Sequence, residues 1–278
     1  MRTLIRRQAV LAGLVLVVSA VLHGQLLEAP IPHTSGQSVT ASFEGWYQNA
    51  DGSYSLSFGY FNRNYEEVVD IPVGPNNRIE PGPGDQGQPT RFQPRRHTGV
   101  FTVRVPKDFG DKQKVTWTLV SAGQTIAVPG HLRPEWKIDA LREPTSNNTP
   151  PVVKLSESGP TGQGPGGVRI AATATKGASL ALNIWVTDDN VFKATGGGEG
   201  RPAMGIVLSA YRGTGKVTFS TAEPKVAAGR ASATATFAEA GSYTLRALAW
   251  DASGRPAFVM AGGFQCCWTN AYIDVIVK

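Results

Sequence analysis

Three aspartates at the ends of predicted strands have the residue type and spacing that could bind a metal ion. Asp188 and Asp189 end the strand expected at 179–189, and Asp251 follows the strand expected at 242–250. Carboxylates at strand ends could supply oxygen ligands to calcium, which takes about six to eight of them. The adjacent side chains of Asp188, Asp189 and Asn190 converge only in a curled loop, so the alternative is that these residues form turns. Calcium is the one cofactor that the sequence suggests.

The two cysteines, Cys266 and Cys267, are adjacent and are candidates for redox chemistry. Neighbouring Cα atoms lie about 3.8 Å apart, below the roughly 4.4–6.8 Å of most disulfides, so a bond between the two sulfurs would need a strained turn. In an extended strand the two side chains point to opposite faces. The sequence therefore favours one buried and one outward thiol, and the outward thiol could cross-link two molecules in an oxidising compartment.

Aromatic residues of the N-terminal half could form a platform on which sugar rings stack. The candidates are Trp46, Tyr47, Tyr65 and Trp136. Aromatic side chains in strands more often belong to the core, and this is the alternative interpretation.

No stretch of the sequence has a recognisable catalytic pattern. None of the four histidines belongs to a His-x-x-x-His pair, and there is no Gly-x-Ser-x-Gly elbow. A carboxylate pair brought together from distant positions is the remaining enzymatic alternative. The residues that could form it are Glu44, Glu66, Glu67 and Asp70. The sequence predicts a protein that is not an enzyme.

The N-terminus, residues 1–24, is typical of a secretory signal peptide. Three arginines within the first seven residues precede an apolar run at 9–22, which is short for a membrane span. Small residues at 18–20 suit a signal peptidase. The alternative is an uncleaved anchor, and only through this segment would the chain contact a membrane. The segment predicts an extracytoplasmic protein, periplasmic or secreted.

Net charge argues against a nucleic-acid partner. Without the three arginines of the signal segment, 24 basic residues face 21 acidic ones, a net charge of +3. Nucleic-acid binding needs a concentrated basic surface, which so small an excess does not supply.

The first predicted domain, residues 38–141, has a strand pattern. A turn at Asp51-Gly52 joins two apolar segments, and in the second the residues at 54, 56, 58 and 60 share one face, which predicts a hairpin. About six strands are expected within roughly 100 residues, the density of a β-sandwich. Residues 74–97 contain five prolines and are expected to form a long loop, either functional or disordered.

A polar, proline-rich linker at 142–151 is expected to separate this domain from a second one at 152–278. Further strands are expected from 168 to 277, with a glycine-rich insertion at 192–203. The clearest pair is 231–237 and 242–250, where apolar residues at 243, 245, 247 and 249 alternate with other residues. The fold class is therefore all-β, with two immunoglobulin-like β-sandwich domains in tandem after the signal peptide.

Several segments between residues 149 and 278 resemble the PKD-like group of bacterial immunoglobulin-like modules. They are Thr149-Pro150-Pro151, the strand that ends at Asp189, the segment 213–219, and Gly241-Ser242-Tyr243-Thr244-Leu245-Arg246 with Asp251. The resemblance covers residues 149–278 and departs at the glycine-rich insertion and at 264–268. It implies an extracytoplasmic β-sandwich used for spacing, adhesion or recognition, and it implies no reaction.

Taken together, these patterns predict an exported, non-enzymatic binding, adhesion or structural module of the bacterial cell envelope. Its partner is expected to be an envelope protein or a glycan. The alternative function is that of a carbohydrate-binding accessory protein for an extracytoplasmic enzyme system.

Overall fold

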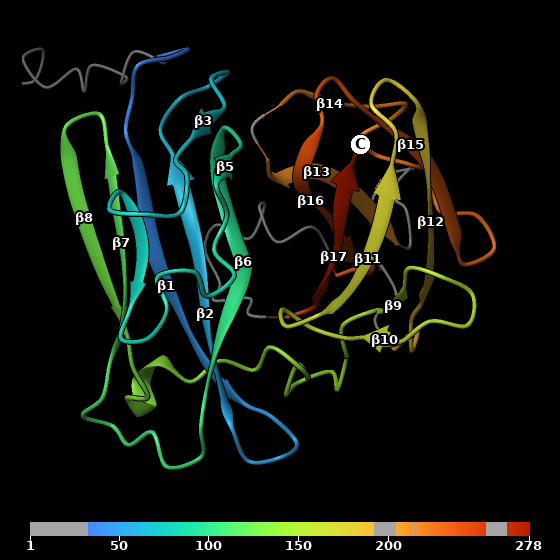
Figure 1. The fold of residues 1–278 in the computed structure, drawn as a ribbon. Coiled ribbons are helices and arrows are strands. Elements are labelled where there is room, and N and C mark those ends of the chain that lie inside the picture. The colour runs from blue at the N-terminus through green and yellow to red at the C-terminus, as the bar shows by residue number, and fades with distance from the viewer. Residues whose placement is uncertain (1–32, 192–203, 214, 254–265) are drawn as a thin grey trace, which may run out of the picture. The chain divides into compact units, whose positions relative to one another are not determined.

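The hairpin predicted around Asp51-Gly52 is confirmed in the computed structural model, which describes residues 33–191, 204–213, 215–253 and 266–278. Strand β1 (Val39–Gln48) pairs antiparallel with β2 (Tyr54–Asn62). The residues at 56, 58 and 60 are buried, but Ser55 and Ser57 on the other face are buried as well, so both faces of this central strand are covered. The hairpin thus supplies one wall of a sandwich (Figure 1).

Two antiparallel three-stranded sheets build the N-terminal sandwich. One sheet has the order β1-β2-β6 and the other has the order β4-β7-β8. A two-stranded ribbon, β3-β5, and one 3-10 turn, η1, complete it. The bounds are β3 (Val69–Asp70), β4 (Asn77–Glu80), β5 (Arg91–Phe92), β6 (Arg95–Val105), β7 (Val115–Ser121), β8 (Gln124–Gly130) and η1 (Pro134–Trp136).

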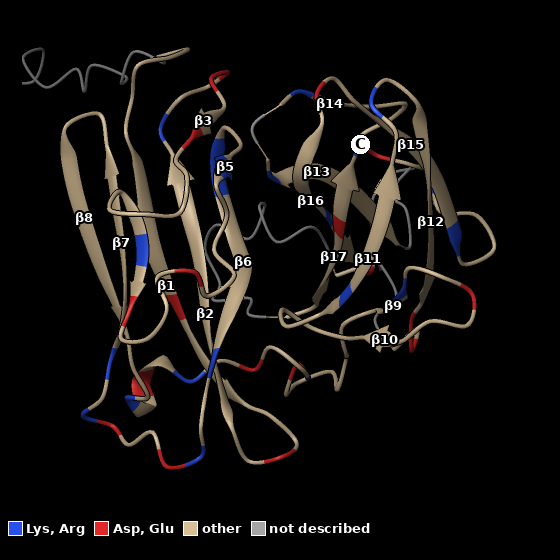
Figure 2. Cartoon of the chain, in the orientation of Figure 1, with Lys and Arg blue, Asp and Glu red and all other residues tan. Residues whose placement is uncertain are grey.

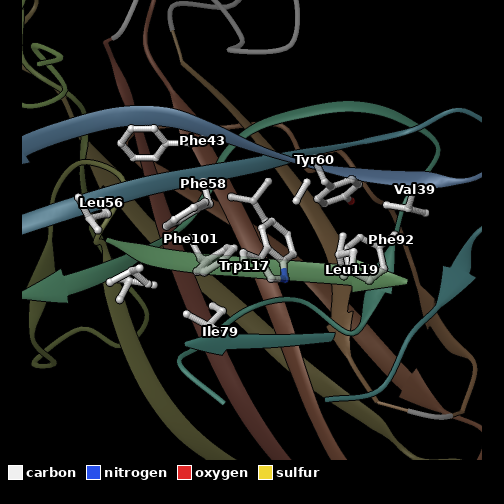
Figure 3. Packing of buried hydrophobic residues seen from close by; sticks show 14 of the residues in the cluster. Val39, Phe43, Leu56, Phe58, Tyr60, Ile79, Phe92, Phe101, Trp117 and Leu119 are labelled. Carbon is white, nitrogen blue, oxygen red and sulfur yellow. The ribbon is translucent and has the colours of Figure 1, made fainter. Parts of the chain in front are cut away.

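The core of this sandwich is built around Trp117, which is fully buried on β7. Its ring meets the Phe101 ring edge-on, with centroids 5.0 Å apart, and stacks at 6.3 Å from Phe92. Its indole Nε1 donates a hydrogen bond to Asn77 Oδ1 at 2.9 Å, so the one polar atom of this buried side chain has a partner. Figure 3 shows these rings packed together with Phe58 and Leu119.

The segment 74–97 is not the featureless loop that its composition predicts. It contains β4, whose Ile79 is fully buried, as well as β5 and the start of β6. β4 pairs with β7 from Asn77 opposite Leu119 to Glu80 opposite Thr116. Only one apolar side chain occurs in this four-residue strand, so no alternation marks it, and the burial comes from the partner strand.

The C-terminal sandwich has a five-stranded sheet of order β10-β9-β12-β15-β14 and a four-stranded sheet of order β11-β17-β16-β13. The bounds are β9 (Val152–Lys154), β10 (Thr161–Gly162), β11 (Val168–Ala174), β12 (Ser179–Thr187), β13 (Gly205–Arg212), β14 (Val217–Phe219), β15 (Arg230–Phe237), β16 (Gly241–Trp250) and β17 (Trp268–Val277). β11 runs parallel to β17, and the other described strand pairs of this sandwich are antiparallel.

Strand order identifies both halves as immunoglobulin-like sandwiches. In the C-terminal half, with β10 and the edge strand β11 set aside, the remaining seven strands lettered A to G in chain order place A, B, E and D in one sheet and G, F and C in the other. In the N-terminal half, with the β3-β5 ribbon set aside, β1, β2 and β6 correspond to A, B and E, and β4, β7 and β8 correspond to C, F and G. The chain is therefore all-β with two β-sandwiches in tandem, as the sequence predicts.

Residues 34–278 form one compact unit. Among the described residues, no helix has the length and apolar character needed to cross a bilayer. The predicted signal peptide and the glycine-rich insertion at 192–203 lie outside the described residues.

Candidate functional site at the junction of the sandwiches

Two β-bulges bring Glu44 and Gly99 together across strand β2. Glu44 is the extra residue where the β1–β2 register shifts between Phe43 and Gly45. On the other side of β2, the β2–β6 register shifts between Phe58 and Tyr60, opposite the β6 segment that contains Gly99. The Glu44 carboxylate crosses over Gly59 and accepts a hydrogen bond from the Gly99 backbone N–H. A side chain at Gly59 would occupy the position of this carboxylate, so the bridge requires glycine there.

Burial changes the acidity of Glu44. Its side chain is 9% exposed, and it also contacts Ser42 and Arg96. Removal of the carboxylate from water raises its pKa from 4.5 to about 7, against the opposing effects of the Gly99 hydrogen bond and the Arg96 charge. Near neutral pH the group is thus divided between its charged and neutral forms.

The carbonyl of the same Gly99 binds the last strand of the chain. It accepts a hydrogen bond from Trp268 Nε1 at 3.2 Å and another from Asn270 Nδ2 at 2.8 Å. One residue further along β6, the Val100 carbonyl accepts from the Tyr272 hydroxyl at 2.6 Å. Three side chains of β17 therefore dock on one bulge of β6, and Tyr272 belongs to the apolar core cluster of the N-terminal sandwich.

Arg246 is hydrogen-bonded to Asn270, one of the docking residues, and only 4% of the arginine residue is exposed to solvent. Its Nε and Nη2 both donate to Asn270 Oδ1, at 2.9 and 2.7 Å. The sequence gives one signal for it: Arg246 interrupts the apolar strand β16 on the face opposite Leu245 and Ala247. An arginine on the outer face of a sheet ordinarily reaches solvent, so only the tertiary structure reveals that it is buried.

A second set of contacts joins the sandwiches through Arg212 at the end of β13. Its guanidinium forms two hydrogen bonds to the Asp85 carboxylate, at 2.7 and 2.9 Å, and its Nε donates to the Gln88 carbonyl at 2.7 Å. Next to it, the Thr90 N–H donates to the Tyr211 carbonyl at 3.2 Å. Most other charged residues lie in loops, and the strands are largely uncharged (Figure 2).

The predicted calcium ligands lie near one end of the C-terminal sandwich but do not all point inward. Asp189 is engaged by Thr149 and by the Val191 N–H. Asp188 Oδ1 is buried and unpaired, and burial followed by the charges of Asp251 and Asp189 raises the Asp188 pKa. Among the described residues, no three His, Cys, Asp or Glu side chains form a group that could hold a metal ion.

The linker is tied to these aspartates. Asn148 is fully buried, and its Nδ2 donates to Asp251 Oδ2 at 2.7 Å while its Oδ1 has no partner among the described residues. Asp251 Oδ1 accepts from the Ser253 N–H. Segment 143–151 is therefore held in place by hydrogen bonds, which its polar composition did not predict.

Cys266 and Cys267 form a disulfide with each other, and both are buried, at 5% and 1% exposure. The interpretation with an outward thiol is wrong, because the pair does not lie in an extended strand. The cysteines precede β17, and both sulfurs lie against the Asn148 carbonyl, at 3.8 and 3.5 Å. Their redox role stays a prediction.

The four aromatic candidates do not form one platform. Tyr47 is buried with Ile138, and the Tyr65 ring, 50% exposed, is covered by Arg95 at 4.0 Å. Of the four candidates, only Trp46 and Trp136 could still belong to one sugar-binding surface.

Trp46 and Trp136 are both associated with the short segment 133–136. Trp46 Nε1 donates to the Arg133 carbonyl at 2.8 Å, and Trp136, 42% exposed, lies three residues after Arg133. The Trp136 ring packs at 5.3 Å from Phe43 and 5.8 Å from His131, which fixes its orientation.

The four carboxylates considered for a catalytic pair have separate surroundings. Glu44 binds Gly99, Glu67 accepts from the Gly36 N–H at 2.6 Å, and Asp70 pairs with Arg91 at 2.9 Å. Glu66 is exposed. Each of the three bonded groups thus serves a different contact.

Comparisons with known proteins give only distant likenesses. No protein-family model and no curated protein matches the sequence. The D00-D0 domain of intimin aligns at 9% identity and a TM-score of 0.27, over 86% of this chain and 99% of that chain. The Yersinia pseudotuberculosis adhesin InvE aligns at 10% identity and a TM-score of 0.26, over 87% and 59%. A chimeric titin Z1Z2 aligns at 13% identity and a TM-score of 0.23, over 88% and 98%. Likenesses at this level assign neither a family nor a function to this chain.

Proposed function

We propose that this chain is an exported, non-enzymatic module of the bacterial cell envelope that serves binding, adhesion or structural support. The observation that carries the proposal is the junction between the sandwiches. A connection through Gly99, Asn270 and the Arg212–Asp85 pair holds the two halves in one compact unit. Two sandwiches joined by such contacts suit a part that transmits force or presents a surface, and this role needs no reacting group.

Localisation and envelope binding test this proposal directly. Expressed in its own cells, the protein should lose residues 1–24, as the N-terminal sequence of the purified chain would report, and should fractionate outside the cytoplasm. The purified protein should sediment with isolated envelopes in a saturable manner. A cytoplasmic location with an intact N-terminus, or no saturable sedimentation, would contradict it.

The carbohydrate-binding alternative is favoured by one observation, the exposed and immobilised ring of Trp136. Stacking of a sugar on this ring would change its fluorescence and raise the thermal unfolding midpoint. Soluble envelope glycans are the probes, Trp136→Ala should abolish the response, and Tyr65→Ala is the matched exposed-aromatic control. Equal responses from the two variants would contradict a glycan site at Trp136.

We also infer a PKD-like assignment for residues 152–278, with residues 142–151 as the boundary segment after a first domain at 38–141.

A calcium site at one end of the C-terminal sandwich is supported by two buried, unpaired oxygens, Asp188 Oδ1 and Asn148 Oδ1, next to Asp251. Calcium should raise the unfolding midpoint of the wild type but not of Asp188→Asn. Identical midpoints with calcium and with chelator would remove calcium from the proposal.

A further inference from the structure

A cavity of about 260 Å³ lies between the two sandwiches, beside the Gly99 contact. Its floor is a patch of the C-terminal sandwich, where β13 and β16 pair with Ser209 opposite Arg246 and Val207 opposite Leu248. The floor therefore has one polar row and one apolar row, side by side.

The wall of the cavity comes from the N-terminal sandwich. Gln93, Pro94 and His97 contribute to it. Hydrogen bonds hold these residues in place, because the Gln93 N–H donates to the Tyr60 hydroxyl at 2.9 Å and His97 Nε2 lies 3.0 Å from the Pro94 carbonyl. The His97 ring also stacks on Tyr60, with centroids 4.9 Å apart. The cavity is thus built by residues that are fixed before any ligand enters.

Arg246 places an uncompensated positive charge at this cavity. Its two measured hydrogen bonds go to the neutral Asn270 Oδ1, the neutral Tyr272 hydroxyl also lies within hydrogen-bond reach, and no described carboxylate lies within 4.0 Å of its guanidinium. No Arg246 nitrogen is among the unpaired atoms sealed from solvent. A buried charge is costly unless it is paired, and a guanidinium has five N–H donors, which neutral acceptors can satisfy without supplying the missing negative charge.

Glu44 is the nearest candidate counter-ion, but it is committed elsewhere. Its carboxylate binds the Gly99 N–H, Ser42 and Arg96. Arg246 acts on Glu44 only as a distant charge, with the smallest of the effects on that carboxyl group. The positive charge of Arg246 also acts on the Tyr60 and Tyr272 hydroxyls. Both hydroxyls are neutral at physiological pH, because burial raises the pKa of each above its ordinary value, so neither supplies a negative charge.

We propose that this cavity binds a small monocarboxylate with a short apolar body, whose carboxylate oxygens accept hydrogen bonds from Arg246. A carboxylate matches the planar donor pattern of a guanidinium and supplies the missing charge. Val207, Leu208 and Leu248 would contact the apolar body. The volume is below the roughly 300–1,000 Å³ of pockets for drug-sized ligands, so the ligand is small. The site is independent of the proposed envelope function.

Butyrate is the probe, with butyramide as its neutral counterpart of the same shape. Titration of the purified, isotopically labelled protein, followed through the arginine Nε–Hε resonances in NMR spectra, should give a saturable shift with butyrate. We expect a dissociation constant of about 1 mM, equivalent to about 4 kcal/mol. Butyramide should bind at least about tenfold more weakly, because it cannot neutralise the guanidinium. Phosphate, which has no apolar body to contact the apolar side of the cavity, should also bind more weakly.

Two variants and one control locate the binding. Arg246→Met should abolish the butyrate response, whereas Arg169→Met, which removes an arginine paired with Asp274 outside this cavity, should retain it. Ser209→Leu should also abolish it, because the larger side chain fills the cavity while Arg246 stays in place. This third variant decides the question should Arg246→Met fail to fold.

Four results would overturn the proposal. The first two are equal affinities for butyrate and butyramide, and butyrate binding that persists in folded Arg246→Met or Ser209→Leu. The third is no saturable shift of the wild type below 100 times the expected dissociation constant. The fourth is loss of binding in Arg169→Met as well, because the response would then not be specific to the cavity.

Discussion

Asn270 in the last strand donates a hydrogen bond of 2.8 Å to the carbonyl of Gly99, 171 residues earlier in the chain. The same amide nitrogen donates to the Pro165 carbonyl at 2.8 Å, and the amide oxygen holds Arg246. A single buried side chain therefore connects a bulge of the N-terminal sandwich, a loop of the C-terminal sandwich and a buried charge. Buried networks of this kind are stabilising only when every member is satisfied.

Replacement of Gly99 by alanine should disrupt the junction. The residue has φ +54°, and an added β-carbon would overlap the indole ring of Trp268. The left-handed backbone and the overlap together should reduce the free energy of unfolding by at least about 3 kcal/mol. Gly177→Ala is the matched control, with φ +76° and no atom within 4 Å of the added carbon, and should cost about 1–2 kcal/mol. Urea unfolding of both variants measures the difference, and equal losses would show that Trp268 is free to move.

Glu44 should make the protein less stable as the pH rises from about 4.5 to 7. Its pKa is raised in the folded state, so the folded protein binds more protons than the unfolded chain in this window. The stabilising contribution of the Glu44 proton is fully present below the pKa of the unfolded chain and is lost as the pH rises through about 7. The resulting fall in the free energy of unfolding is at most about 3 kcal/mol.

Glu44→Gln should flatten this dependence, because an amide does not titrate. The variant should be about 1–2 kcal/mol more stable than the wild type at pH 8, since the desolvation cost is removed while Arg96 loses its partner. Urea midpoints between pH 5 and pH 8 measure it, and Glu67→Gln should follow the wild-type curve. Parallel curves for Glu44→Gln and the wild type would contradict the pKa assigned to Glu44.

Arg212 should contribute more to stability than its partner Asp85. Arg212→Met removes both hydrogen bonds to Asp85 and the one to the Gln88 carbonyl, and should cost about 1–3 kcal/mol. Asp85 is 51% exposed, so Asp85→Asn should cost less than about 1 kcal/mol at pH 7.

The pH dependence of this pair has a definite sign. The Arg212 hydrogen bonds lower the Asp85 pKa, so the contribution of the pair is present above the unfolded pKa and is lost on acidification below about pH 4. Asp51→Asn, at the exposed ion pair with Arg104 on the hairpin, is the control for a charge change away from the junction. A larger loss for Asp85→Asn than for Arg212→Met would contradict this account.

The cysteines should not react in the folded protein. Because Cys266 and Cys267 are bonded to each other and buried, maleimide without reductant should leave the mass of the protein unchanged. Unfolding with reductant should allow two additions, and a non-reducing gel should show a monomer. A single addition to the folded protein, or a disulfide-linked dimer, would restore the outward-thiol interpretation.

Alternation along single strands was enough to predict much of the fold. In β16, residues 243, 245, 247 and 249 are all buried in the C-terminal core, as a period of two requires. The turn at Asp51-Gly52 likewise predicted its hairpin. The strand β4 could not be predicted in this way, because its single apolar residue becomes buried only through pairing with β7.

The candidate site was decided by the tertiary structure. In the sequence, Glu44, Gly99 and Arg246 are an acid, a glycine and a base on three strands, with nothing to connect them. Two bulges, the small residue at Gly59 and the docking of β17 bring them together. The sequence by itself determined most of the long strands and which face their side chains take, because these depend on neighbours along the chain. The outer faces of the sheets that meet at the junction are buried by contacts between residues more than 100 positions apart in the sequence. Only the tertiary structure therefore decided which polar residues form the junction.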